Sequence, residues 1–312
     1  MVTTQSMLAE IGSGTASELT PDSPPGPTFI QSLDEVLVAS RPHPGGSTLQ
    51  RGDLVEVIGP SGSGKTALCV FLLMTTLLPA TMTVGGVEVT IDGRGKKAAI
   101  LSPPSHASVR PALRRAMQRH IEDCLQQVPH TAADVDIVID AALANLTVVK
   151  PQPRWTSWAV ALRKIATKKD LEMVVCDGFG DGYWVERWEH EERRAGNTMR
   201  DAWDALTHLR QTVGAVVVVT VQGLKPHLPA PYPSVFDGQR WGITFQLTLL
   251  GRKRSLQFPA ETTAVEALRA RHLGQTQEYI GVLRIPGGGG EAGTPRGARW
   301  TFVIDDAGLV AA

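Results

Sequence analysis

The chain has 312 residues, and its 31 lysines and arginines balance its 31 aspartates and glutamates. A net charge of zero argues against a protein that coats nucleic acid by bulk charge, although it leaves room for a local basic patch. With 42% apolar and 20% charged residues, the composition is that of a globular protein that can bury a core without disulfides or a structural metal.

The cysteines and the apolar runs set further limits. Cys69, Cys124 and Cys176 form no Cys-x-x-Cys pair and predict reduced, buried thiols. We recognise no basic segment followed by an apolar stretch at the amino terminus, so we expect no secretory signal. The longest strongly apolar run, residues 215–221, is too short to span a bilayer, and we expect no membrane partner.

Helices and strands are predicted to alternate through most of the chain. Residues 1–27 are rich in serine, threonine, proline and glycine and predict a disordered arm, followed by one domain over residues 28–312. A short helix is expected near residues 29–40, and residues 81–97 suggest a loop or hairpin insertion. The patterns predict strands at 53–59, 98–104, 145–151, 171–180 and 215–223, and helices at 65–78, 109–128, 154–169 and 197–214. In the last of these helices, Asn197 is the expected N-cap and Gly214 the expected stop.

The strands indicate the fold class. Apolar strands without polar alternation, separated by helices, are typical of a parallel sheet that is covered on both faces. After about residue 235 the pattern changes, and residues 243–258, 278–286 and 298–310 read as antiparallel strands. We therefore predict an α/β domain whose sheet has a β-rich carboxyl-terminal extension.

A phosphate-binding loop connects the first strand to the first long helix. The stretch "GPSGSGKT" matches G-x-x-x-x-G-K-[ST] in full, between an apolar strand and an apolar helix. Its glycines allow backbone N–H groups to converge on phosphate oxygens at the positive end of the helix. The motif predicts a site for ATP and Mg²⁺ made by Gly59, Pro60, Ser61, Gly62, Ser63, Gly64, Lys65 and Thr66. Lys65 would reach the β- and γ-phosphates, and the Thr66 hydroxyl would bind the metal.

Two further residues complete the predicted site. Asp177 ends the apolar strand "MVVC" and would hold Mg²⁺ through water. Gln222 ends the next apolar strand, where it could sense the γ-phosphate or simply terminate the strand. Together with Thr66, Asp177 is the predicted metal-binding group. No His–Cys or His–Asp spacing in the sequence suggests another metal.

A group that activates water is not recognised in the sequence. Ser102, Pro103 and Pro104 follow the second strand, where an acid is expected, and Gly178 follows Asp177. Glu56 lies within the first strand, where a structural role is expected. The sequence thus supports nucleotide binding, gives no support to hydrolysis, and identifies no catalytic residue.

The order of these parts resembles the RecA-like recombinase core. That core has a Gly-x-x-x-Glu-x-x-Gly-Pro lead into the loop, matched by Gly52, Glu56, Gly59 and Pro60, and then a strand ending in Asp and a strand ending in Gln. The stretch "CDGFGDGYWVERWE" is similar to the segment after the acid strand in recombinase paralogues, with Tyr183, Trp184 and Arg187 keeping the pattern. The likeness covers residues 49–310 and is strongest at 52–79 and 171–188.

The resemblance implies a nuclear, ATP-binding protein that assembles with other RecA-like paralogues and promotes homologous recombination repair of double-strand breaks. The chain departs from the family at Leu101-Ser102-Pro103, where the recombinases carry their catalytic glutamate. It also lacks the Phe-x-x-Ala polymerisation motif, since Phe29 is followed by Ile30, Gln31 and Ser32. Self-polymerisation is therefore not expected.

Three interpretations of function follow. The first is the paralogue just described, and the second is an active DNA-dependent ATPase of the same fold. The third, a P-loop small-molecule kinase, is less favoured because we recognise no arginine-rich lid after the acid strand. Two surface features stay ambiguous: "GRKRS" (251–255) would bind single-stranded DNA or form a solvated hairpin turn. Residues 183–197 would form a partner surface anchored by Trp184 and Trp188, or a solvated helix.

Overall fold

A computed structural model gives the structure of the chain. It describes residues 26–41, 48–183, 186, 192–223, 241–252, 263, 265–266, 277–286, 297–305 and 308–310. The predicted arm over residues 1–27 therefore lies outside the described residues, except for Gly26 and Pro27. The domain bounds predicted above stay a prediction.

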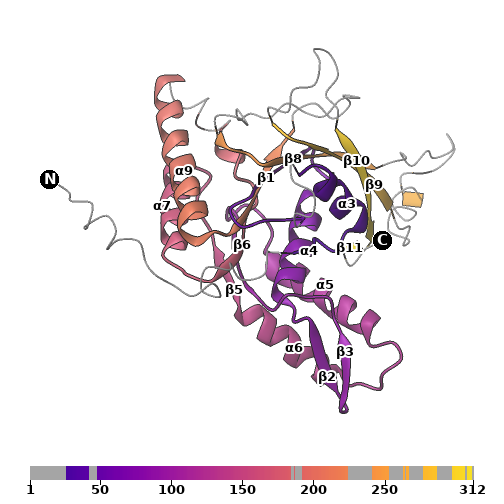
Figure 1. Cartoon of the computed structure of the whole chain (residues 1–312). Coiled ribbons are helices and arrows are strands. Elements are labelled where there is room, and N and C mark those ends of the chain that lie inside the picture. Colours follow the sequence, from indigo (N-terminus) through magenta and orange to yellow (C-terminus); the bar gives the residue numbers. More distant parts are fainter. Residues whose placement is uncertain are drawn as a thin grey trace.

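Within the described residues, nine strands form a central sheet in the order β11-β10-β9-β8-β1-β7-β6-β4-β5 (Figure 1). Their bounds are Leu54–Gly59 (β1), Lys97–Leu101 (β4), Leu146–Val149 (β5), Leu171–Cys176 (β6), Val216–Gln222 (β7), Phe245–Arg252 (β8), Gln277–Arg284 (β9), Ala298–Asp305 (β10) and Gly308–Val310 (β11). The strands from β8 to β5 run parallel, whereas β9, β10 and β11 are antiparallel to their neighbours. The chain is thus an α/β protein with a large, mostly parallel sheet and added antiparallel strands, as predicted.

The direction of β8 differs from the prediction. β8 is antiparallel to β9, but it runs parallel to β1, with Val55 opposite Phe245 and Ile58 opposite Thr248. The reason is topological: the chain leaves β7 at the carboxyl end of the sheet and enters β8 at the amino end, so β8 has to run in the direction of β1. The antiparallel extension therefore begins at β9.

Helices cover both faces of the sheet, as Figure 1 shows. The helices are Gln31–Ala39 (α3), Lys65–Leu77 (α4), Val109–Cys124 (α5), Ala132–Ala144 (α6), Trp155–Ala166 (α7) and Glu192–Val213 (α9). Val55 and Val57 of β1 lie in one core cluster with side chains of α3, α4, α5 and α6. Leu54 and Ile58 lie in the other, with α7 and α9. β1 is therefore buried on both faces, which explains why its sequence is apolar except for Glu56.

Two helices differ from the sequence-based expectation. α6 was not predicted, although Thr131 and Asp134 form a capping box at its start, and a Thr-x-x-Asp sequence carries that signal. α9 begins at Glu192, so the prediction that Asn197 caps it is wrong. The preceding residues "ERRA" are mostly good helix formers, which extend the helix by more than one turn. The expected stop is confirmed: α9 ends at Val213, and Gly214 has a φ of 68°.

The hairpin expectation is met, and the expectation of buried cysteines is met at two of the three positions. Residues 81–97 contain a hairpin, β2 (Thr81–Val84) with β3 (Val87–Thr90), which projects away from the central sheet (Figure 1). The three cysteines are free thiols, of which Cys69 and Cys176 are buried and Cys124 is half-buried. No helix within the described ranges is long and apolar enough to cross a membrane.

Candidate nucleotide site

The loop between β1 and α4 places its basic residue at the start of the helix. Gly64 precedes α4 with a φ of 92°, a conformation that side-chain-bearing residues rarely adopt. A Cβ there would lie 2.7 Å from Ile304 Cδ1 and 3.1 Å from Phe302 Cε2, both on β10. The antiparallel extension therefore presses directly on the loop, and glycine is the residue that fits.

Lys65, the first residue of α4, folds back over the loop. Its ammonium group donates hydrogen bonds to the carbonyl oxygens of Gly59 (2.8 Å) and Pro60 (2.9 Å). Burial lowers the pKa of Lys65, while the carboxylates of Asp177 and Asp181 act in the opposite direction. The amine thus lies between the loop backbone and the acidic side of the site.

Asp177 faces the loop from the end of β6. The Thr66 hydroxyl donates to Asp177 Oδ2 (3.3 Å), and the Thr220 hydroxyl of β7 donates to Asp177 Oδ1 (2.8 Å). Thr220 also accepts the Gly178 N–H (2.7 Å), so it fixes the turn that follows the acid. The carboxylate, which directly follows β6, is thus held by side chains from two other elements, α4 and β7.

A cavity of about 410 Å³ is lined both by residues of the loop and by the acids. Lys65, Thr66 and Asp177 all line it. Gln222 lines the same cavity from the end of β7, where it lies directly opposite Gly59 in the sheet. Because β7 separates β1 from β6, the tip of β7 stands between loop and acid. Seven of the ten predicted residues line this cavity: Ser61, Gly62, Gly64, Lys65, Thr66, Asp177 and Gln222. Gly59, Pro60 and Ser63 are not among its lining residues, and Ser63 is buried.

Sequence reasoning missed two members of the site, His106 and Asp181. β4 ends at Leu101, and a turn closed by the His106 N–H and the Pro103 carbonyl (3.0 Å) returns the chain towards the cavity. His106 Nε2 lies 2.9 Å from Asp181 Oδ2, and its Nδ1 lies 3.5 Å from Asp177 Oδ2. In "LSPPSH" no acid directly follows β4. The polar side chain that reaches the site is that of His106, five residues after the end of the strand.

The carboxylates change the ionisation of this histidine. Hydrogen bonds with Asp177 and with Asp181 raise the pKa of His106 to about 10. Burial would raise the pKa of Asp177, but hydrogen bonds from His106 and Thr220 and the charge of His106 outweigh it, and the pKa is lowered. At neutral pH the site thus holds an imidazolium between two carboxylates.

Glu56 lies outside this cavity. It is fully buried in β1, and the Gln246 side chain donates a hydrogen bond to it (3.0 Å). This is the structural position expected from the sequence. Glu56 and Gln246 therefore form a polar pair that is separate from the group around Asp177. The group around Asp177 lines the cavity.

An aromatic cluster supports the acidic turn from beneath. Phe179 is fully buried, and its ring meets those of Trp155, Trp158 and Trp203 edge to face at centroid distances of 5.1, 5.2 and 5.4 Å. These tryptophans come from α7 and α9, which lie against one another. Packing of this density leaves the backbone after Asp177 little freedom to shift.

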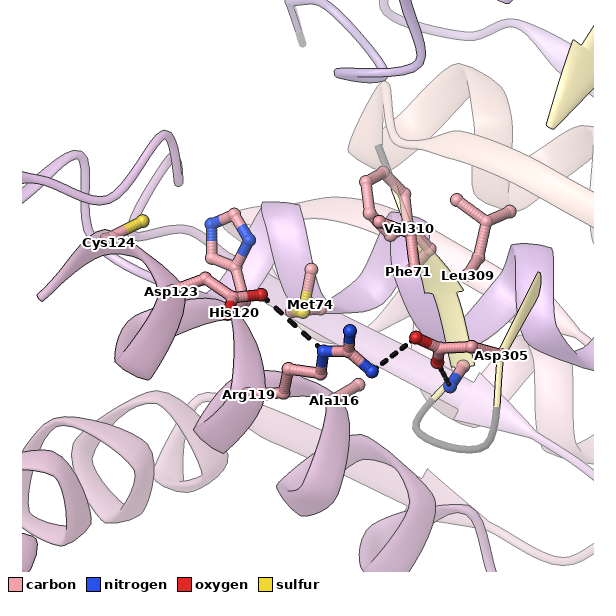
Figure 2. A pocket seen from close by; sticks show the side chains of 11 residues that line it. Phe71, Met74, Ala116, Arg119, His120, Asp123, Cys124, Asp305, Leu309 and Val310 are labelled. Atoms are coloured by element: carbon pink, nitrogen blue, oxygen red, sulfur yellow. Dashed lines mark hydrogen bonds and ion pairs between the residues drawn. The ribbon is translucent and has the colours of Figure 1, made fainter. Parts of the chain in front are cut away.

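A second cavity, of about 280 Å³, lies between α4, α5 and the strands β10 and β11 (Figure 2). Phe71 and Met74 of α4 form its apolar wall, and β11 closes it. Arg119 of α5 pairs with Asp305 of β10 and lies 3.5 Å from Asp123. This cavity contains no glycine loop. The ion pair between Arg119 and Asp305 joins the antiparallel extension to α5.

No protein-family model matches the chain, and no curated protein is significantly similar to it in sequence.

The donor atoms of the side chains at the site therefore indicate which ligands it could bind. A hydroxyl and a carboxylate oxygen, Thr66 and Asp177, are the hard ligands that Mg²⁺ uses together with substrate phosphates. Within the described ranges no group of three or more His, Cys, Asp or Glu side chains could hold a metal ion. The hydroxyl of Thr66 and the carboxylate of Asp177 are donors that fit Mg²⁺ bound together with a nucleotide.

Several predicted features cannot be placed. Trp184, Arg187, Trp188 and residues 253–255 lie outside the described residues, so neither the proposed partner surface nor the basic stretch is located. Tyr183, at the edge of that segment, is half-buried against the α7–α9 core.

Proposed function

We propose that the protein is a RecA-like recombinase paralogue that binds ATP with Mg²⁺. The observation that carries this proposal is the convergence of Lys65, Thr66, Asp177 and Gln222 on one cavity at the carboxyl edge of a parallel sheet. A helix amino terminus behind a glycine loop attracts phosphate, and the opposed acid provides for the metal. In its sequence motifs the chain resembles, as a divergent member, the paralogue called X-ray repair cross-complementing protein two.

On this proposal the protein acts in the nucleus within a complex of RecA-like paralogues. The complex promotes assembly of strand-exchange filaments on single-stranded DNA during homologous repair of double-strand breaks. ATP serves there as a bound ligand that stabilises the fold around the loop, since a ligand that binds the native state alone stabilises it by mass action. The basis for the partners is the sequence resemblance over residues 49–310.

Purification of the tagged protein from its source cells, followed by mass spectrometry, tests this function. We expect RecA-like proteins among the partners, and we expect Lys65→Ala to reduce their recovery because it weakens the nucleotide-bound form. Lys164→Ala, which removes an exposed lysine at the end of α7, serves as the matched control. Failure to recover any RecA-like partner with the wild-type protein would contradict the proposal.

A second candidate function is a DNA-dependent ATPase of the same fold. Asp181 favours it, because its carboxylate lines the same cavity as Asp177 and is a group that could accept a proton from water. Turnover of ATP measured with and without single-stranded DNA separates the two candidates. DNA-stimulated hydrolysis that Lys65→Ala abolishes would favour the ATPase over a static nucleotide-bound protein.

A further inference from the structure

Neither burial nor loop packing explains the position of the His106 side chain in the site. Its side chain is 31% exposed, and both ring nitrogens face carboxylates, with Asp181 on one side and Asp177 on the other. Asp181 has the same exposure, and its hydrogen-bonded partner is this ring. Because a carboxylate contacts each ring nitrogen, Asp177 and Asp181 fix the orientation of the His106 ring at the cavity.

The turn after Asp177 is shaped to admit the ring. Gly178 has a φ of 82°, and a Cβ there would lie 2.6 Å from His106 Cε1 and 2.7 Å from Asp181 Oδ2. The missing side chain at Gly178 therefore creates the space in which the imidazole and its carboxylate partner meet. This observation is independent of the hydrogen bonds and points to the same pair.

The two contacts of the ring are unequal. Nε2 lies 2.9 Å from Asp181, a normal hydrogen-bond length, whereas Nδ1 lies 3.5 Å from Asp177, at the limit of a hydrogen bond. Asp177 Oδ2 also receives the Thr66 hydroxyl, the group that would bind Mg²⁺. If Asp177 bound the metal, the longer contact is the one that the ring would lose, while the hydrogen bond with Asp181 would remain.

The position of the ring indicates which group of a bound nucleotide Nδ1 of His106 would contact. Thr66 and Asp177 are the residues that would bind the metal, and in such a site the metal accompanies the last phosphates. His106 Nδ1 lies 3.5 Å from Asp177 Oδ2, and the ring lines the same cavity. The terminal phosphate is therefore the anionic group of a nucleotide that would come nearest to the ring.

We propose that His106, held by Asp181, contacts the terminal phosphate of the bound nucleotide through Nδ1 and so selects a triphosphate over a diphosphate. Asp181 is the positioning residue of this pair. The inference rests on the proposed nucleotide binding and deepens it. It gives the protein a means of distinguishing ATP from ADP whether or not ATP is hydrolysed.

Binding of two probes without turnover tests this. Isothermal titration calorimetry in excess Mg²⁺ would compare ADP with a non-hydrolysable ATP analogue, on wild type, His106→Ala, His106→Gln and Asp181→Asn. A hydrogen bond to a charged group is worth about ten- to a hundredfold in affinity, so we expect His106→Ala to weaken the analogue by that factor and to leave ADP nearly unchanged. Asp181→Asn should weaken the analogue less, and His106→Gln, which keeps a donor, should recover part of the loss.

His130→Ala is the matched control, because His130 is an exposed histidine whose ring contacts the Val128 carbonyl, away from the site. If wild type binds neither probe, the proposed function itself fails. If wild type binds both and His106→Ala retains the full preference for the analogue, the assignment of His106 is overturned. Tighter binding of both probes by His106→Ala would also overturn it, since the ring would then be a group that nucleotide must displace.

Discussion

Thr220 is the residue that fixes the metal-binding acid most directly, and its replacement by valine gives a measurable prediction. The hydroxyl is 1% exposed, donates to Asp177 Oδ1 at 2.8 Å and accepts the Gly178 N–H at 2.7 Å. Thr220→Val removes both bonds while it keeps the shape of the side chain. A lost hydrogen bond to a charged group and a buried N–H without a partner each cost about 1–3 kcal/mol, so we expect a loss of about 2–4 kcal/mol in the free energy of unfolding.

Urea unfolding of wild type and Thr220→Val measures this loss. Thr212→Val is the matched control, because Thr212 is exposed on α9 and its hydroxyl donates to the His208 carbonyl within the helix. We expect the control to change the free energy of unfolding by less than about 0.5 kcal/mol. In a double-mutant cycle with Asp177→Asn, the two changes should be clearly less than additive, because they disrupt one interaction. A loss from Thr220→Val no larger than that of the control, with additive effects in the cycle, would refute the account of how Asp177 is held.

Three further predictions concern the same region. Gly64→Ala forces a side chain into a φ of 92° and against Ile304, so chemical unfolding should show a loss of about 1–3 kcal/mol; an unchanged midpoint would show that the loop is not tight. Phe179→Ala removes the ring at the centre of the aromatic cluster and should cost about 3–5 kcal/mol, measured by the unfolding transition in tryptophan fluorescence; a cost below about 1 kcal/mol would mean that the cluster does not support the turn. The raised pKa of His106, about 10, means that its stabilising contribution is fully present below the unfolded pKa of 6.5 and is lost as the pH rises through 10. In metal- and nucleotide-free buffer, the excess in melting temperature of wild type over His106→Gln should therefore shrink between pH 6.5 and pH 10, and an excess that grows with pH would contradict this.

The parallel part of the fold could be predicted because burial on both faces leaves a strong signature. β1, β6 and β7 are nearly unbroken apolar runs; β1 ends in Gly59, β7 ends in Gln222, and Asp177 directly follows β6. The phosphate loop is equally local, since eight adjacent residues define it. These features depend on neighbours in the sequence, which is why a sequence alone reveals them.

The parts that could not be predicted depend on distant neighbours. The direction of β8 depends on whether the chain re-enters the sheet at the amino or the carboxyl end of the parallel strands. The apolar sequence of β8 is compatible with either direction. His106 reaches the site because a turn carries it back and because Gly178 leaves space for its ring, and the two residues lie far apart in sequence. α6, by contrast, carries a local signal in the capping box of Thr131 and Asp134, so its start can be read from the sequence.

Nucleotide binding is the central claim, and calorimetric titration of the purified chain with an ATP analogue and Mg²⁺ tests it most directly. Lys65 supplies the positive charge of the loop, so the wild type should bind, and Lys65→Ala should weaken binding at least about tenfold, the loss expected for a hydrogen bond to a charged group. The control, Lys164→Ala, should bind as the wild type does. An absence of binding by the wild type, or equal binding by Lys65→Ala, would contradict the account.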